Sequence, residues 1–181
     1  PKITIHPQKL EALAKKKMSK EAFAYIAGGA GTEATMRSNR KDFSQWQIVP
    51  RMLQNVESFD LSIELFGQKH PTPLLLAPVG VLDLAHPDKE LAVARAAADR
   101  GIPMIFSNQA STPMETCSAA MGDQTRWFQL YWSKSREMVA SFIRRAENCG
   151  CSAIVLTLDT TMLGWRPRDL EAAFLPFLWS K

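Results

Sequence analysis

Four apolar segments in this sequence each end in an uncharged polar side chain or in a glycine-bearing turn. LLLAPVG ends at Gly80, FSNQ carries Ser107, RWFQLYW carries Gln129 and LTLD carries Thr157. Amide and hydroxyl groups can bind carbonyl oxygens and ring nitrogens without carrying charge. Glycine allows a planar ring to lie close to the backbone. We therefore expect a flat heterocyclic ligand at these segment ends.

RWFQLYW, residues 126–132, is the most informative of these segments. Alternation along a strand puts Trp127, Gln129 and Tyr131 on one face, and Phe128, Leu130 and Trp132 on the other. An amide and a phenol on so apolar a strand suggest that one face meets a ligand. A satisfied buried amide is the alternative interpretation of Gln129.

Two further residues have a functional and a structural interpretation. Arg166 could supply, with Tyr131, the donors that an anionic substrate requires. In the charged, proline-bearing WRPRD it could equally be a solvated loop arginine. Thr157 could bind a ligand, or it could be a β-branched strand residue with a local hydrogen bond.

The elements that must position these residues alternate in type from residue 71 onward. Apolar strands alternate with helices, which is typical of parallel βαβ units buried on both faces. The predicted strands are 74–78, 103–107, 126–132 and 152–159, and the predicted helices are 90–101, 112–121 and 135–150.

Two α/β folds contain such units, the doubly wound sheet and the (β/α)8 barrel. A doubly wound nucleotide fold is expected to carry GxGxxG after its first strand, where this chain has APVG. A barrel unit takes about 30 residues, so residues 71–181 hold roughly four. We predict the first half of a (β/α)8 TIM barrel over 71–181. Residues 1–70 precede it as a lead-in of helices (8–17, 19–28 and 32–45) and a small hairpin at 61–67.

A half-barrel has a physical consequence, because it leaves edge strands unpaired and its inward face in water. The chain also ends in the apolar AAFLPFLWSK. We therefore expect the functional unit to contain a second piece. The rest of the same protein after a chain break is favoured over a self-association that closes the sheet.

Composition excludes several classes of function. The chain has 181 residues, of which 46% are hydrophobic, and a net charge of +4, as in soluble globular proteins. No apolar run is long enough for a membrane span, and we expect no signal peptide, because the N-terminal stretch is polar and basic. Cys117, Cys149 and Cys151 lack metal or redox spacing and predict free thiols in a cytoplasmic protein. No metal site is expected, nor nucleic-acid binding, since no aromatic-basic stripe accompanies the charge.

Seven motifs, in this order, resemble the FMN-dependent L-2-hydroxy-acid oxidase and dehydrogenase family over nearly the whole chain. They are YIAGGAG (25–31), RML (51–53), LLLAPVG (74–80), FSNQAS (106–111), RWFQLYW (126–132), LTLDT (156–160) and LGWRPRDL (163–170). SNQAS with LGWRPRDL is most similar to the lactate 2-monooxygenase branch. Glycolate oxidase and lactate oxidase are close relatives.

The resemblance implies FMN as cofactor and assigns residues to it. The backbone of Pro78, Val79 and Gly80 would lie against the flavin near its reactive nitrogen. Side chains that hydrogen-bond the isoalloxazine rim would be Ser107, Gln129 and Thr157.

It also implies the residues that act on the substrate. Tyr25 and Tyr131 would bind or orient the carboxylate and hydroxyl of a 2-hydroxy acid, and Arg166 would close over it. Asp159 would orient a catalytic histidine. In the family that histidine, the carboxylate-binding arginines and the phosphate-binding loops come from the second half of the barrel. This chain by itself is therefore expected to be inactive.

The implied activity is oxidation of a lactate-like L-2-hydroxy acid with O2 in a homo-oligomer, a tetramer or higher. The monooxygenase branch gives acetate, CO2 and water. Lactate or glycolate oxidases instead release the keto acid and H2O2. Two rivals remain, a non-flavin barrel enzyme such as an aldolase or isomerase, and a non-catalytic flavin-binding or structural half-barrel. The first needs a strand-end base, for which only Asp159 is available.

Overall fold

A computed structural model describes residues 4–160 and 162–176 and divides the chain into two compact units. One unit joins Pro1–Gln54 to Leu163–Lys181, and the other comprises Asn55–Met162. The predicted boundary between a lead-in (1–70) and the half-barrel (71–181) stays a prediction. The end of the apolar AAFLPFLWSK, residues 177–181, lies outside the described residues.

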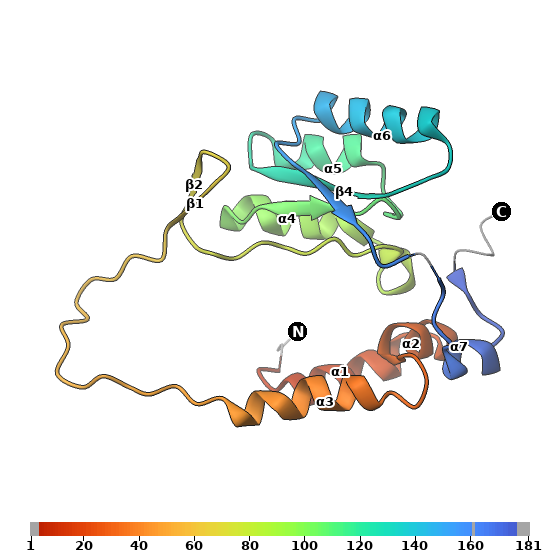
Figure 1. Cartoon of the computed structure of the whole chain (residues 1–181), viewed down its shortest axis with the longest axis horizontal. Coiled ribbons are helices and arrows are strands. Elements are labelled where there is room, and N and C mark those ends of the chain that lie inside the picture. Colours follow the sequence, from red (N-terminus) through yellow and green to blue (C-terminus); the bar gives the residue numbers. More distant parts are fainter. Residues whose placement is uncertain (1–3, 161, 177–181) are drawn as a thin grey trace. The chain divides into compact units, whose positions relative to one another are not determined.

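The first unit is helical (Figure 1). Its helices are α1 (Pro7–Lys17), α2 (Lys20–Ala27), α3 (Ala34–Asp42), the 3-10 turn η1 (Phe43–Gln45) and α7 (Pro167–Glu171). The hydroxyl of Ser19 accepts a hydrogen bond from the Ala22 amide at 3.1 Å and so caps α2. The three helices predicted in the lead-in are confirmed. Helix α7 was not predicted, although Pro167 is a residue suited to a first helical turn.

A small hairpin opens the second unit, as predicted. Strand β1 (Ile63–Leu65) pairs antiparallel with β2 (Gln68–His70). The Phe66 ring at its turn makes an edge contact with the Trp127 ring, with centroids 5.3 Å apart. Gln68 accepts a hydrogen bond from the Thr125 hydroxyl at 3.2 Å. The hairpin is thereby attached to the start of β4.

A parallel sheet forms the centre of the second unit, with strand order β3 (Met104–Phe106), β4 (Arg126–Tyr131) and β5 (Ile154–Thr157). The strand predicted at 74–78 is reduced to one parallel bridge between Leu76 and Met104. Pro73 and Pro78 flank that bridge, and proline has no N–H to donate to a ladder. The other three predicted strands are confirmed, each somewhat shorter than expected.

Helices separate these strands along the chain. They are η2 (Leu82–Leu84), α4 (Lys89–Arg100), α5 (Met114–Met121) and α6 (Arg136–Asn148). Phe128 and Leu130 lie in the buried core, and the Phe128 ring stacks on Phe142 of α6 with centroids 5.8 Å apart. Trp132 was expected on the same face, but it is 65% exposed because β4 ends at Tyr131.

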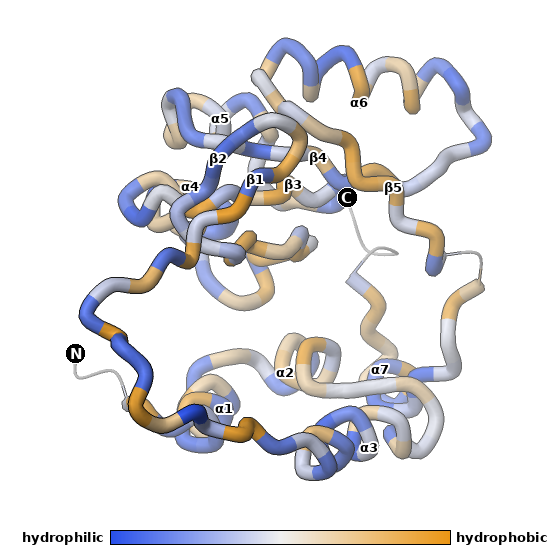
Figure 2. The backbone as a smooth tube through the Cα atoms, turned by 60° about the vertical axis from the view of Figure 1, so that its left-hand side comes forward, coloured by the Kyte–Doolittle hydropathy of each residue, from blue (hydrophilic) through white to orange (hydrophobic). Residues whose placement is uncertain are grey.

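Strand β5 lies at one edge of this sheet and exposes apolar side chains. Ile154 and Leu156 of β5 are exposed, as is Leu158 directly after it, and Figure 2 shows β5 as a hydrophobic stretch of the chain. Within residues 4–160 and 162–176, no strand pairs with the far edge of β5. An unpaired edge with an exposed apolar face is what a partial barrel leaves behind.

No helix in the described part of the chain is both long and apolar enough to cross a membrane.

Candidate active site

The C-terminal ends of β3, β4 and β5 are joined by one hydrogen-bonded network around Gln129. The Gln129 side chain is 2% exposed. Its Oε1 accepts from the Asn108 backbone N–H at 3.0 Å, and its Nε2 donates to Thr157 Oγ1 at 2.9 Å. A primary amide carries a second Nε2 hydrogen. Gln129 is therefore a satisfied buried amide that still has one hydrogen to donate.

Gly80 and Ser107 lie close together on two neighbouring loops. A Cβ at position 80 would lie 3.3 Å from Ser107 Oγ and 3.1 Å from Gln109 Cβ. The Val81 N–H donates to the Gln109 carbonyl at 3.0 Å, and Ser107 Oγ accepts from the Gln109 N–H at 3.1 Å. Glycine at 80 is thus explained by the close approach of the two loops. Contact of a planar ring with this backbone stays a prediction.

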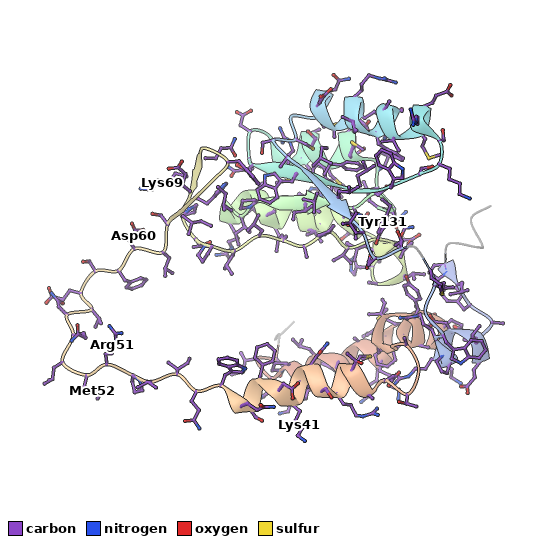
Figure 3. The ribbon with its side chains drawn as sticks, viewed as in Figure 1. Lys41, Arg51, Met52, Asp60, Lys69 and Tyr131 are labelled. Atoms are coloured by element: carbon purple, nitrogen blue, oxygen red, sulfur yellow. The ribbon has the colours of Figure 1, made fainter. Side chains whose placement is uncertain are left out.

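The remaining candidates of the second unit lie in or beside these elements. Tyr131 ends β4 (Figure 3), pairs with Thr157 in the ladder and donates its N–H to Asn108 Oδ1 at 2.9 Å. Pro78 is half-buried and Val79 is exposed in the turn before Gly80. Asp159 is exposed two residues beyond the end of β5.

Tyr25 and Arg166 come together in the first unit. Arg166 Nη2 donates to the Tyr25 carbonyl at 2.7 Å, and its guanidinium lies 5.2 Å from the centre of the Tyr25 ring. Arg166 also forms an ion pair with the buried carboxylate of Asp169. The interpretation of Arg166 as a solvated loop arginine is therefore wrong.

A second ion pair attaches α7 to the helices of the first unit. Arg168 Nη2 lies 2.6 Å from Glu33 Oε2, and Glu33 Oε1 accepts from the Gly29 N–H at 3.2 Å. The hydrogen bond from Gly29, with a further contribution from Arg168, lowers the pKa of the Glu33 carboxyl. Arg166 is thus presented by a short helix held through charged contacts.

Sequence reasoning missed the residues that support the loop after β3. Glu90 is buried at the start of α4 and accepts from the Ser111 N–H at 2.9 Å. The Ser111 hydroxyl donates to Asp83 at 2.8 Å. The sequence predicts a helix that starts at Glu90, but nothing in that pattern indicates its burial. Asn108 follows the strand predicted at 103–107, and its contacts with both Gln129 and Tyr131 are seen only in the structure.

The cysteines offer no reactive nucleophile. Cys117, Cys149 and Cys151 are free thiols, as predicted. Burial raises the pKa of Cys117 to about 11 and that of Cys151 to about 12, so both remain protonated near neutral pH. The described residues contain no group of three or more His, Cys, Asp or Glu side chains that could hold a metal ion.

Comparison with known proteins identifies the family. A family model described as FMN-dependent dehydrogenase matches residues 14–180. The chain belongs to the FMN-dependent dehydrogenase family. It is 42% identical over 177 residues to an FMN-dependent alpha-hydroxy acid dehydrogenase of Penicillium citrinum, covering 98% of this chain and 44% of the relative. It is 46% identical over 167 residues to an L-lactate oxidase of Lysinibacillus sphaericus, covering 92% of this chain and 43% of that protein.

Solved structures agree with this family assignment. A lactate oxidase of Pediococcus acidilactici superposes with a TM-score of 0.91 at 34% identity, covering 96% of this chain and 48% of that structure. This dehydrogenase-family chain therefore spans about half the length of the relatives it matches. The predicted fold class, an α/β chain forming half of a (β/α)8 barrel, is confirmed.

The donor set at the strand ends fits the family's cofactor. Thr157 Oγ1 and Ser107 Oγ each accept a hydrogen bond from within the chain, so their hydroxyl hydrogens can point outward. The second hydrogen of Gln129 Nε2 adds a third neutral donor. Neutral donors suit the carbonyl oxygens and ring nitrogens of an isoalloxazine.

Proposed function

We propose that the assembled protein containing this chain binds FMN at the C-terminal ends of its strands and oxidises a lactate-like L-2-hydroxy acid with O2. The neutral hydrogen-bonding groups at the strand ends, those of Gln129, Thr157 and Ser107, carry this proposal. Membership of the FMN-dependent dehydrogenase family supports it.

In this proposal, FMN when bound accepts the hydride equivalent taken from the substrate. Gln129, Thr157 and Ser107 hydrogen-bond its rim, while the Pro78–Gly80 backbone supports the ring. Neutral donors fixed in a buried network need little reorganisation when charge develops on a bound group.

Substrate contacts are assigned to Tyr25, Tyr131 and Arg166. Tyr25 and Tyr131 bind or orient the carboxylate and hydroxyl of the substrate, and Arg166 closes over it. The contacts of Arg166 with Asp169 and the Tyr25 carbonyl use two of its five N–H donors, and the remaining donors can meet a carboxylate. Asp159 orients a histidine base supplied by the second half of the barrel.

The lactate 2-monooxygenase outcome is the leading candidate for the overall reaction. Lactate and O2 then give acetate, CO2 and water, because the keto acid stays bound and is decarboxylated. SNQAS and LGWRPRDL support this choice.

An oxidase that releases the keto acid and H2O2 is the second candidate. The relative of Lysinibacillus sphaericus, 46% identical, is an L-lactate oxidase. Other relatives include a glycolate oxidase of Zea mays that is 41% identical.

The proposed working unit includes a second barrel half, either from the same protein or as a separate chain. The exposed apolar residues of β5 and the half-length match to relatives support this partner. We further propose a cytoplasmic homo-oligomer, a tetramer or higher. A non-catalytic half-barrel subunit is the outcome if no second half assembles.

The test begins with an affinity tag on this chain in its native cells. The purified assembly is examined for intact polypeptide masses, for flavin absorbance and for the products formed from L-lactate. We expect a histidine-bearing second half, FMN, and acetate without H2O2. H2O2 with no acetate would contradict the monooxygenase. Absence of flavin despite both halves would contradict the whole proposal.

A further inference from the structure

The two ladders of the sheet end at different levels. Main-chain pairing of β3 with β4 stops at Phe106 opposite Phe128. Pairing of β4 with β5 continues to Tyr131 opposite Thr157. The last residues of β4 therefore have no main-chain pair on the β3 side, and their N–H groups on that side need other acceptors.

Asn108 supplies the acceptor for the end of β4. Its side-chain Oδ1 accepts from the Tyr131 N–H at 2.9 Å. The half-buried amide side chain thus replaces a carbonyl that a longer β3 would have provided. Tyr131 is held by the ladder with β5 on one side and by this side chain on the β3 side, so the Asn108 side chain helps to set the position of the phenol.

The main chain of Asn108 has a separate partner. Its N–H donates to Gln129 Oε1 at 3.0 Å. A backbone N–H can only donate, so it requires the oxygen of the Gln129 amide to face it. Nε2 then faces Thr157, to which it donates at 2.9 Å. Asn108 therefore controls Gln129 through its backbone and Tyr131 through its side chain.

We propose that Asn108 is a positioning residue whose side chain sets substrate affinity through Tyr131 while leaving cofactor binding unchanged. This inference rests on the proposed function. The separation follows from the two hydrogen bonds, because truncating the side chain removes the acceptor for Tyr131 and keeps the N–H that meets Gln129. Alignment of a binding group is worth about one order of magnitude when one hydrogen bond that holds it is lost.

Asn108→Ala in the assembled protein, purified from its native cells, tests the inference. We expect KM for L-lactate to rise about tenfold, with a smaller change in kcat. FMN affinity and the flavin absorbance spectrum should stay unchanged. Ser133→Ala is the matched control, because it removes a hydroxyl acceptor for the Ser135 N–H in the exposed loop after β4. It should leave KM unaltered.

A double-mutant cycle distinguishes action through Tyr131 from a general loosening of the loop. In a Tyr131→Phe background, Asn108→Ala should raise KM no further, since residues that act in series are not additive. An additive effect, or loss of FMN from Asn108→Ala, would overturn the inference. So would an unchanged KM in Asn108→Ala when the wild-type assembly oxidises L-lactate. A wild-type assembly that oxidises no 2-hydroxy acid would overturn the proposed function and this inference together.

Discussion

The two ends of β4 are built from opposite kinds of chemistry. At its start, the Arg126 guanidinium donates to the carbonyls of Ser118, Gly122 and Cys149, at the ends of α5 and α6. At its finish, Gln129 and Tyr131 take part in a network of neutral groups. One strand of six residues thus carries a cation at one end and amides at the other.

The difference shows which groups remain available to a ligand. Helix C-terminal carbonyls are electron-rich and need donors, so the N–H donors of a cation there are bonded within the chain and are not available to a ligand. The neutral network satisfies its acceptors internally and leaves hydroxyl and amide hydrogens unused. Active sites of such barrels lie at the C-terminal ends of the strands, where the second arrangement occurs.

Arg126→Ala should remove the charged contacts at the N-terminal end of β4. We expect the free energy of unfolding to fall by about 3 kcal/mol, because carbonyls that accept from a charged donor lose it. Urea unfolding of the assembled protein measures this loss. Arg126→Lys keeps the charge without the planar fork and should recover only part of it. A loss below about 1 kcal/mol would mean that water replaces the guanidinium.

Gln129→Leu, at the C-terminal end of β4, should reduce FMN affinity more than it reduces stability. We expect FMN affinity to fall about tenfold or more, with a loss of stability of about 1–2 kcal/mol from the unpaired Asn108 N–H. Titration of the apoprotein by flavin fluorescence measures the affinity. Gln129→Glu keeps an acceptor for Asn108 but loses the donor to Thr157. If it binds FMN as tightly as wild type, the donor role of Gln129 is wrong.

Gly80→Ala tests how tightly the C-terminal loops are packed. The added Cβ would be 3.1 Å from Gln109 Cβ, and such overpacking costs about 1 kcal/mol. We expect a slightly lower melting temperature. Gly164→Ala is the control, since its Cβ would meet the Ala30 Cβ at 3.4 Å. Equal losses in the two variants would show that the approach to Gln109 is not what requires glycine.

Glu115→Gln should have the smallest effect and sharpens the contrast with Arg126. Hydrogen bonding from Arg145 lowers the pKa of Glu115. The Glu115 side chain is 50% exposed and the Arg145 side chain is 42% exposed. Because the folded pKa is depressed, the stabilisation is present above the unfolded pKa of 4.5 and is lost as pH falls through the folded pKa.

The exposed pair should contribute under about 0.5 kcal/mol at pH 7. The stability difference between wild type and Glu115→Gln should be smaller at a pH below the folded pKa of Glu115 than at pH 7. Urea unfolding at both pH values measures it. A difference that persists in acid would show that the carboxylate charge is not its cause.

Much of the fold could be predicted because its elements are local. Helices 90–101 and 135–150 were recognised within one or two residues, since their apolar spacing and terminal glycines are properties of neighbouring residues. The strand at 74–78 was overestimated, because its apolar composition outweighed the flanking prolines.

The candidate site could be predicted less completely. Gln129 and Thr157 were found because polar groups are unusual on apolar strands. Arg166 was assigned to a loop, because its contact with the Tyr25 carbonyl spans 141 residues. Asp169 and Glu90 were missed because charged residues in the first turn of a helix are ordinarily solvated.

The sequence by itself determined the alternation of strands and helices, the neutral residues at the strand ends and the family to which they belong. Only the tertiary structure decided the partners of those residues. Gln129 meets Asn108 and Thr157 from positions 21 and 28 residues away. The reason is geometric, since hydrogen bonds from one strand to the next strand, or to the loop after it, depend on the register of the sheet, and the register is set by packing of the whole unit.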